Sequence, residues 1–293
     1  MNKIEFLIID KENEGRRLDN VLFSIFKKVP KSKIYSSIRK AAIKVNKKKT
    51  KPDYKLQSQD VVSYPIFTQK ADIMISPNLN DHQRLIKDAI MYESENYIVI
   101  NKPPNYAVHG GSGLNFGIIE IIRSLYPYSD KFNLAHRIDK LTSGCLIIAK
   151  KMSALRSIHK QFRERKIKKI YECIVVGSWP NSLKKVESSL LTKKNNDKRS
   201  TTVSKEGKQS MTKFKVQKKY KEHTHLLAIP ITGRTHQIRA HCADAGFPLL
   251  GDHKYGSQKE KIRMMLHARE IQFTDEDKKV RLVAKNDYGF GLV

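Results

Sequence analysis

The chain has 293 residues, with 57 lysines and arginines against 29 aspartates and glutamates, which gives a formal net charge of +28 at pH 7. A charge of this size opposes compaction unless it lies on a surface that binds a polyanion. Nucleic acid is therefore the expected partner, and an acidic membrane surface is the alternative. No apolar run in the sequence approaches the length of a membrane-spanning helix. The composition argues against a membrane protein and predicts one or two domains with a proper core.

The three cysteines, Cys145, Cys173 and Cys242, lie far apart in or beside apolar segments. Their spacing matches no set of metal ligands, and an odd number argues against a disulfide framework. The apolar patch at the start of the chain is too short for a signal peptide. We therefore expect inert buried thiols in a protein of the reducing cytoplasm.

Residues 15–64 are expected to form a small basic unit. Apolar residues between Leu18 and Phe26 recur at helical spacing, and Ser32 can cap a second helix. No acidic residue occurs at positions 27–51, although lysines and arginines crowd this stretch. A merely solvated face would carry interspersed acids, so we predict a surface that follows the phosphates of a nucleic acid.

This unit resembles the small RNA-binding domain of the S-four type, which is named after a small-subunit ribosomal protein. The matching residues are Arg17-Leu18-Asp19 and Ile43-Lys44-Val45-Asn46. That family usually has a glycine after the second helix, where this chain has Ala41-Ala42. If the turn needs a positive φ, an alanine there carries strain. On the basic face we expect contacts to RNA from four residues: Lys33, Arg39, Lys44 and Lys47.

Three later segments carry weaker signals. In residues 65–90 the apolar residues recur at no regular spacing, and this stretch is interpreted as a linker that runs into the next domain. The glycines after His109 lack the GxxxxGK and GxGxxG spacings, so nucleotide binding has little support. Residues 192–210 are polar, basic and rich in Asn, Ser and Thr. We expect a mobile loop there that becomes ordered on RNA.

The stretch HRIDKLTSG, at residues 136–144, places one carboxylate, Asp139, among basic residues and just before an apolar run that predicts a buried strand, Cys145–Ala149. It can be a polar turn in which Asp139 bonds its own backbone. Alternatively, nearby cations hold the carboxylate ionised on a loop anchored by a rigid strand, which is a common setting for chemistry. This segment alone favours the turn, and the second half of the chain reverses that preference.

Two other kinds of site fit the sequence poorly. His236 and His241 are five residues apart and so do not share a helix face, and His223 and His225 have no third metal ligand at a suitable spacing. A glycosidase would need two catalytic carboxylates, and no second acid stands out near Asp139.

Four motifs in order, HRIDKLTSG, Lys169-Ile170-Tyr171, GRTHQIRAH and LHA, resemble the signature of the RluA family of pseudouridine synthases. The resemblance extends over about residues 92–282, and Ile138, where leucine is commoner, is a conservative departure. Together with the amino-terminal domain, the chain is most similar to the family member that acts on several uridines of large-subunit ribosomal RNA. The stretches NKPPNYAVHGGSG, AKKMSALRS and KPDYKL strengthen that comparison.

The resemblance implies a reaction that breaks the N1–C1′ bond of uridine, turns the retained base and rejoins it through C5, without any cofactor. A single ionised carboxylate, Asp139, can stabilise the positive charge that develops on the sugar or attack it. The sequence leaves the covalent route and the glycal route open. The family assigns Arg239 as the ion-pair partner of Asp139.

The remaining roles are also carried over from the family. Tyr171 stacks on the target base and assists proton removal from C5, and Leu266 packs against the base from the other side. Arg137 enters the RNA helix and holds the gap when the uridine flips out. Arg234 is expected to be structural or to bind phosphate. The histidines of these motifs are expected to be hydrogen-bonded scaffold: His136, His236 and His267.

We therefore predict a protein of the α+β class with two domains. Residues 1–70 form the RNA-binding domain, residues 71–84 a linker, and residues 85–293 a catalytic domain whose largely antiparallel mixed sheet is implied by the family. The expected partner is 23S ribosomal RNA or its precursor, and we expect a monomer that binds neither metal nor membrane.

Two other functions remain open. One is a non-catalytic RNA-binding or assembly factor with a vestigial pocket, although a binder would not need Asp139 in a cleft that attracts phosphate. The other is a nuclease, which predicts strand scission or dependence on a divalent metal.

Overall fold

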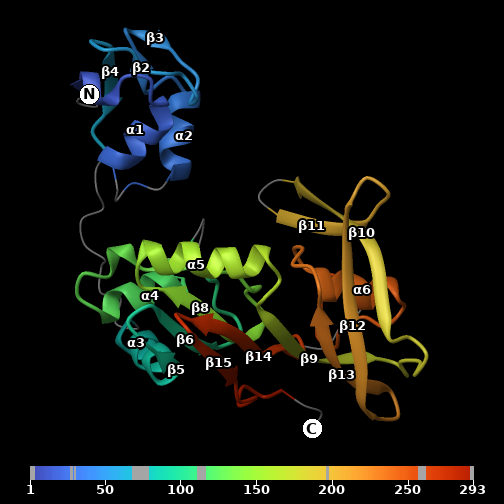
Figure 1. The fold of residues 1–293 in the computed structure, drawn as a ribbon. Coiled ribbons are helices and arrows are strands. Elements are labelled where there is room, and N and C mark those ends of the chain that lie inside the picture. The colour runs from blue at the N-terminus through green and yellow to red at the C-terminus, as the bar shows by residue number, and fades with distance from the viewer. Residues whose placement is uncertain are drawn as a thin grey trace. The chain divides into compact units, whose positions relative to one another are not determined.

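The computed structural model describes residues 4–26, 29, 31–67, 79–110, 117–195, 198–256 and 262–290. The chain divides into two compact units, Met1–Pro77 and Asn78–Val293, which are described separately (Figure 1). Within the described residues, no helix is both long enough and apolar enough to cross a membrane.

The first unit is a small four-stranded sheet, in the order β1-β4-β2-β3, with two helices on one face. The apolar sides of the helices pack on alternate strand residues such as Val45 and Val62, which is why the helical spacing was visible in the sequence. The elements are β1 (Ile4–Ile8), the 3₁₀ turn η1 (Lys11–Asn13), α1 (Leu18–Ile25), α2 (Lys31–Arg39), β2 (Lys44–Val45), β3 (Lys48–Lys49) and β4 (Val61–Pro65).

The turn after α2 carries the strain expected from its sequence. Ala41 has a φ of +55°, in the left-handed region that is costly for a residue with a Cβ atom. The Arg17-Leu18-Asp19 motif also has a clear structural role. Asp19 is only 2% exposed and accepts hydrogen bonds from Arg17 (2.7 Å) and from the Tyr35 hydroxyl of α2 (3.2 Å). The hydrogen bond from Arg17 lowers the pKa of the Asp19 carboxyl, and the buried carboxylate ties the two helices together.

The second unit is built on one mixed sheet, as expected. Its strands run in the order β11-β10-β12-β13-β9-β14-β8-β6-β5, with β15 paired to β14 and β7 paired to β8. Among the described strands, all neighbours are antiparallel except β14 and β8, which pair in parallel through Ser143 and Gly144. The helices are α3 (Leu79–Asp88), α4 (Ile118–Leu125), the 3₁₀ turn η2 (Ser129–Lys131), α5 (Met152–Arg163) and α6 (Gln237–Asp244).

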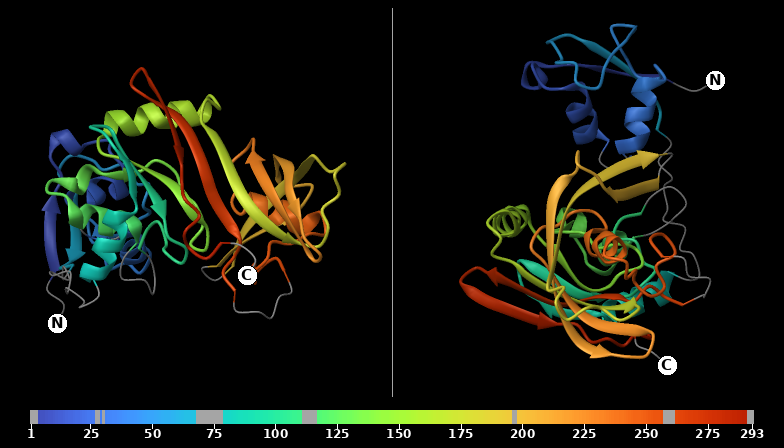
Figure 2. Two further views of the ribbon diagram at one scale, coloured as in Figure 1. Left: turned by 90° about the horizontal axis from the view of Figure 1, so that it is seen from below. Right: turned by 90° about the vertical axis from the view of Figure 1, so that its right-hand side faces the viewer.

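The strands of this sheet have the following bounds: β5 (Ile90–Glu93), β6 (Tyr97–Lys102), β7 (Asn133–Leu134), β8 (Ser143–Ala149), β9 (Lys168–Val176), β10 (Lys185–Asn195), β11 (Lys198–Val203), β12 (Lys208–Lys219), β13 (His223–Pro230), β14 (Leu266–Asp275) and β15 (Lys278–Val283). Figure 2 gives two further views of them.

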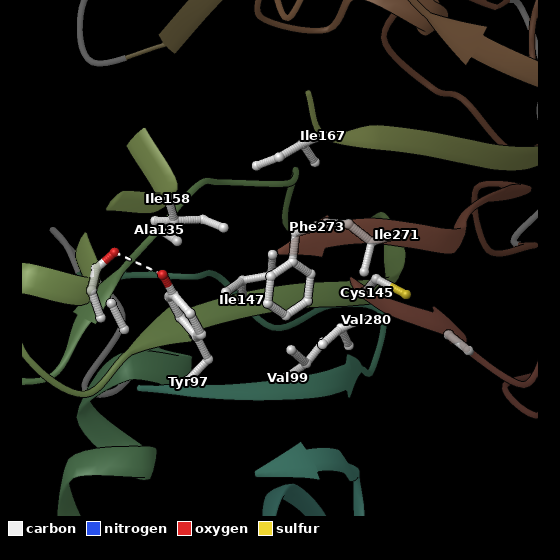
Figure 3. Packing of buried hydrophobic residues seen from close by; sticks show 13 residues of the cluster. Tyr97, Val99, Ala135, Cys145, Ile147, Ile158, Ile167, Ile271, Phe273 and Val280 are labelled. Atoms are coloured by element: carbon white, nitrogen blue, oxygen red, sulfur yellow. Dashed lines mark hydrogen bonds between the residues drawn. The ribbon is translucent and has the colours of Figure 1, made fainter. Parts of the chain in front are cut away.

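The central strands β6 and β8 are covered on both faces, which explains their unbroken apolar runs. Val99 and Ile147 pack toward α5, whereas the intervening Ile98 and Ile148 pack toward α3 and α4. Figure 3 shows the α5 side of this core, where the Tyr97 hydroxyl donates a hydrogen bond to the carbonyl of Ala154 on α5 (2.9 Å).

Helix α6 lies on the same sheet face as α5. Ile158 of α5 packs with Ile271, which is the strand partner of Lys169, and Ile238 of α6 packs with Cys173. Because Lys169 and Cys173 are four residues apart on β9, their side chains share one face. The two helices therefore flank a stretch of that face (Figure 1).

Two segments differ from their expected description. Residues 192–210, expected to be a mobile loop, belong largely to β10, β11 and β12, and Thr201 is buried against Thr192 with a hydroxyl–hydroxyl distance of 3.0 Å. This polar stretch is held by backbone pairing, to which apolar periodicity gives no clue. The expected linker, 71–84, ends inside α3, and its first part, residues 71–78, lies outside the described residues, as do residues 111–116 of the glycine segment.

Candidate active site

Asp139 lies in the loop that joins β7 to β8, and this loop is anchored from several sides. Ile138 is buried in the layer beneath α4, and the amide of Thr142 donates to the carbonyl of Asp139 (3.1 Å), which closes a turn. His136 Nε2 accepts a hydrogen bond from the amide of Ile147 on β8 (3.1 Å). Burial lowers the pKa of His136 to about 3, so the ring is neutral and suited to accept. These contacts fix the backbone on both sides of the carboxylate.

A buried lysine makes a second attachment to this loop. Lys102, the last residue of β6, is 0% exposed, and its Nζ donates to the carbonyls of Pro103 (2.7 Å), Tyr106 (2.9 Å) and Lys140 (3.2 Å). Burial lowers the pKa of Lys102 to about 7, against the attraction of Asp139. Three carbonyls match the three N–H donors of an ammonium group. Lys102 thereby ties the turn after β6 to the residue that follows Asp139.

Gly144, which closes the HRIDKLTSG motif, lets β8 approach β14 closely. Its φ is +106°, and a Cβ atom there would collide with the backbone of Ala268. The LHA segment therefore lies directly beside the end of the Asp139 loop, and a larger residue at Gly144 would separate the two.

Arg239 connects two carboxylates. Its Nη1 donates to Asp139 Oδ2 (3.0 Å), while its Nε and Nη2 make a two-pronged contact with the oxygens of Asp252 (2.8 Å each). Arg239 is 4% exposed and Asp252 is 0% exposed. Although burial opposes the charge, the hydrogen bonds and charges of Asp252 and Asp139 keep the pKa of Arg239 above its ordinary value. The ion pair with Asp139 that the family resemblance implied is present.

The imidazole ring of His236 also lies near the Asp139 carboxylate. Its Nε2 lies 3.7 Å from Asp139 Oδ2, and its Nδ1 is 2.8 Å from the hydroxyl of Tyr255. Burial lowers the pKa of His236, with Asp139 opposing that shift. The Tyr255 ring in turn packs under the Arg239 guanidinium, whose central carbon is 5.0 Å from the ring centroid. Asp139 Oδ2 thus accepts a hydrogen bond from Arg239 and has the His236 ring as a close neighbour.

The carboxylate opens into a cavity of about 310 Å³ between α5 and α6, called the active cavity below. Tyr171 of β9 and Leu266 of β14 line it together with Asp139 and Arg239. The Asp139 side chain is 23% exposed, so it is accessible from this space. Burial, and secondarily the charge of Asp139, raises the pKa of Tyr171, which keeps the phenol protonated. A cavity with an aromatic wall, an aliphatic wall and one aimed carboxylate suits a flat ligand that carries a reacting carbon atom.

The sequence and the fold both match known proteins. A family model described as RNA pseudouridylate synthase matches residues 96–244, and one described as S4 domain matches residues 16–62. The chain is 43% identical over 283 residues to "Ribosomal large subunit pseudouridine synthase C" of Haemophilus influenzae, covering 93% of this chain and 88% of that protein. It is 44% identical to the protein of the same name from Vibrio vulnificus, with 93% and 89% covered. The chain belongs to the RNA pseudouridylate synthase family.

Solved structures show the same fold. The human RNA pseudouridylate synthase domain containing 4 superposes with a TM-score of 0.60 at 23% identity and covers 71% of this chain and 92% of that one. The human RNA pseudouridylate synthase domain containing 1 gives a TM-score of 0.57 at 26% identity, with 68% and 83% covered. The two-part organisation and the mixed sheet agree with membership of this family.

The structure places the expected site residues in two groups. Six of them line the active cavity: Arg137, Asp139, Tyr171, Arg234, Arg239 and Leu266. Of these, Arg137 and Arg234 are exposed. The expected RNA-binding residues of the first unit, Lys33, Arg39, Lys44 and Lys47, are all exposed to solvent. No group of three histidines, cysteines or acids within the described parts of the chain is arranged to hold a metal ion.

Two residues of the site had no assigned role in the sequence, and a third has a contact beyond the role expected for it. Asp252 and Lys102 are buried polar partners of the Asp139 loop and of Arg239, and His236, expected to be scaffold, also approaches the carboxylate. The sequence marked Asp252 and Lys102 only through the residues next to them. Asp252 follows Gly251, whose φ is +76°, and Lys102 precedes two prolines. Neither signal specifies a partner, because the partners lie 13 residues away for Asp252 and 38 residues away for Lys102.

Proposed function

We propose that this protein converts uridine to pseudouridine in large-subunit ribosomal RNA, with Asp139 acting on the sugar of the flipped nucleotide. Membership of the RNA pseudouridylate synthase family supports the reaction. The names of the relatives, which are large-subunit synthases, support the substrate. The observation that carries the proposal is the aimed carboxylate: Asp139 is held by Arg239 at the edge of a cavity of about 310 Å³.

The geometry around Asp139 fits stabilisation of a sugar cation. Both Arg239 and His236 approach the same oxygen, Oδ2, and among the described contacts none occupies Oδ1, which leaves that oxygen for the C1′ atom. In the reaction the N1–C1′ bond breaks and a C5–C1′ bond forms. The proton on C5 leaves and N1 gains one, so the atoms balance without a co-reactant. A preorganised carboxylate stabilises the charge that develops on the sugar.

The two walls of the cavity fit the uracil base. Tyr171 and Leu266 belong to neighbouring strands, and the base is proposed to lie between them. Stacking on an aromatic ring contributes roughly 1–3 kcal/mol per base. Because burial raises the pKa of Tyr171, a phenolate base is disfavoured, and stacking is the better-supported role for this residue. The exposed Arg137 is proposed to fill the gap in the RNA helix, and Arg234 to bind a phosphate.

The first unit is proposed to bind the RNA outside the active cavity. Its match to the S4 domain and the exposure of Lys33, Arg39, Lys44 and Lys47 support this role. We take residues 1–70 as the RNA-binding domain and residues 85–293 as the catalytic domain. A polyanionic substrate explains the net charge of +28.

The test is pseudouridine formation in unmodified large-subunit ribosomal RNA, mapped by carbodiimide treatment and primer extension. Asp139→Asn keeps the shape of the side chain and removes its charge, and it should reduce the rate by about 10³-fold or more while RNA affinity stays largely intact. The control is Asp130→Asn, an exposed aspartate of η2, which should behave as the wild type. Full activity of Asp139→Asn would remove Asp139 from the mechanism. Cleaved RNA, lost on adding a chelator, would indicate a nuclease instead.

A further inference from the structure

A second cavity adjoins the active cavity. It has a volume of about 560 Å³ and lies between the end of α5, the start of β9 and the segment that follows β13. We call it the flanking cavity. The two cavities share part of their lining: Phe162, Lys169, Pro230 and Thr232–Arg234. The two cavities are therefore neighbours with a common wall.

The lining of the flanking cavity combines an apolar floor with positive charge. Five cationic side chains line it: Arg163, Arg165, Lys168, Lys169 and Arg234. No carboxylate is among the described lining residues. The floor is formed by aliphatic residues that include Ile167 and Ile231. Apolar surface beside several cations suits a nucleotide, whose base has two flat faces and whose phosphate carries the negative charge.

Arg165, which lines the flanking cavity, has an unusual backbone conformation. It follows the last turn of α5 with a φ of +55°, at the position where helices most often end in glycine. An arginine there pays a conformational cost that glycine would avoid. Its backbone only needs to donate to the carbonyl of Phe162 (3.2 Å), which glycine would do equally well. The Arg165 side chain is exposed where it lines the cavity.

The wall between the cavities is suited to a phosphate. Lys169 lies there with its Nζ 5.8 Å from the centroid of the Phe162 ring, and Arg234 lines both cavities. Successive nucleotides in RNA share one phosphate. If the target uridine occupies the active cavity and its neighbour occupies the flanking one, the phosphate that joins them lies at this wall.

We propose that the flanking cavity binds the nucleotide next to the target uridine, turned out of the RNA helix together with it. The inference rests on the proposed function and extends it to a second everted nucleotide. Ile231 and Ile167 contact its base, Lys169 and Arg234 bind the phosphate that it shares with the target, and Arg165 binds its other phosphate. The cavity thereby contributes to the choice of uridine through the residue beside it.

The experiment measures binding of the full chain to short stem-loops from large-subunit ribosomal RNA, using the loop that binds most tightly. Arg165→Gly removes the side chain and suits the left-handed backbone. It should weaken binding about tenfold. Arg156→Ala, which removes an exposed arginine two turns earlier on α5 and outside both cavities, should change binding by less than about twofold.

A neutral methylphosphonate at each loop phosphate then locates the contact. At one position the substitution should weaken RNA binding by the wild-type protein about tenfold. The same substitution should weaken binding by Arg165→Gly only slightly, because that variant already lacks the partner of the phosphate. Removing the base of the nucleotide next to that phosphate should likewise weaken binding by the wild-type protein more than binding by Ile231→Ala. Coupling next to the mapped pseudouridine supports the proposal. Equal losses in Arg165→Gly and Arg156→Ala, or no coupled position, would overturn it.

The binding cycles do not depend on turnover. If the wild-type protein formed no pseudouridine while Arg165 coupled to one phosphate of an unpaired nucleotide, the proposed reaction would fail and the nucleotide-binding cavity would stand. If pseudouridine formed normally without such coupling, the reaction would stand and the flanking cavity would be rejected.

Discussion

The two units of the chain use charge in opposite ways. In the first unit the cations expected to meet RNA, such as Lys33 and Lys47, are exposed on the surface. In the second unit the charges that define the site are buried and paired, with Arg239 held between Asp252 and Asp139. Exposed charges act through a smooth, salt-screened field, whereas buried ones require particular partners at particular distances. Single substitutions of the exposed lysines should therefore be tolerated, whereas substitutions in the buried Asp252–Arg239 pair should be damaging.

The largest effect is expected from Asp252→Ala. Asp252 is fully buried and makes two of the hydrogen bonds that direct Arg239. Its loss leaves a buried guanidinium without its main partner, which costs about 3–5 kcal/mol and releases the group that aims Asp139. Urea unfolding should show the loss of stability, and primer extension the loss of pseudouridine. Asp244→Ala, at the exposed end of α6, is the control. Matching unfolding curves for the two variants would contradict the bridging role of Asp252.

An intermediate effect should appear as a dependence on pH. The pKa of His136 in the folded protein is about 3, below its ordinary value of 6.5, so the unfolded chain binds the proton first as the pH falls. This contribution to stability is complete above pH 6.5 and decreases from pH 6.5 toward pH 3, by at most about 1.4 kcal/mol per pH unit. His136→Gln, which can accept the same hydrogen bond without titrating, should flatten that slope.

The measurement is the free energy of unfolding at several pH values below 6.5. His159→Gln, which replaces an exposed histidine on α5 whose Nε2 is 3.1 Å from the carbonyl oxygen of Ala135, is measured beside it for comparison. If His136→Gln lost stability with the same slope as the wild type, the neutral ring would not be the group responsible.

The smallest effect on stability is expected from replacing Lys33 and Lys47 with alanine together. Both side chains are exposed, so the free energy of unfolding should change by less than about 0.5 kcal/mol. The slope of log affinity for RNA against log salt should fall by about 1.5, because two phosphate contacts are lost. Lys278→Ala with Lys279→Ala, at the exposed start of β15 in the second unit, removes the same charge. If the salt-dependence slope fell equally in this variant, the result for Lys33 and Lys47 would reflect net charge alone.

The sequence by itself was sufficient for those features that are local or carried in continuous motifs. The helical spacing after Leu18 and the buried strand after HRIDKLTSG depend on neighbours along the chain, so each was predictable before the fold was known. Strain after the second helix was expected only if the turn there needed a positive φ, and the structure has that φ at Ala41. The family signature supplied Arg239 as the partner of Asp139, and the structure contains that ion pair.

Tertiary structure alone decided what depends on partners that are distant along the chain. The strand pairing of residues 192–210 comes from backbone hydrogen bonds between polar strands, which leave no apolar period to detect. Likewise, two hydrogen bonds form only because the fold brings separate segments together. Arg239 donates to Asp252, and Lys102 donates to the carbonyl of Lys140. Buried polar groups must find partners wherever the fold provides them, and the identity of a residue does not say where its partner will be.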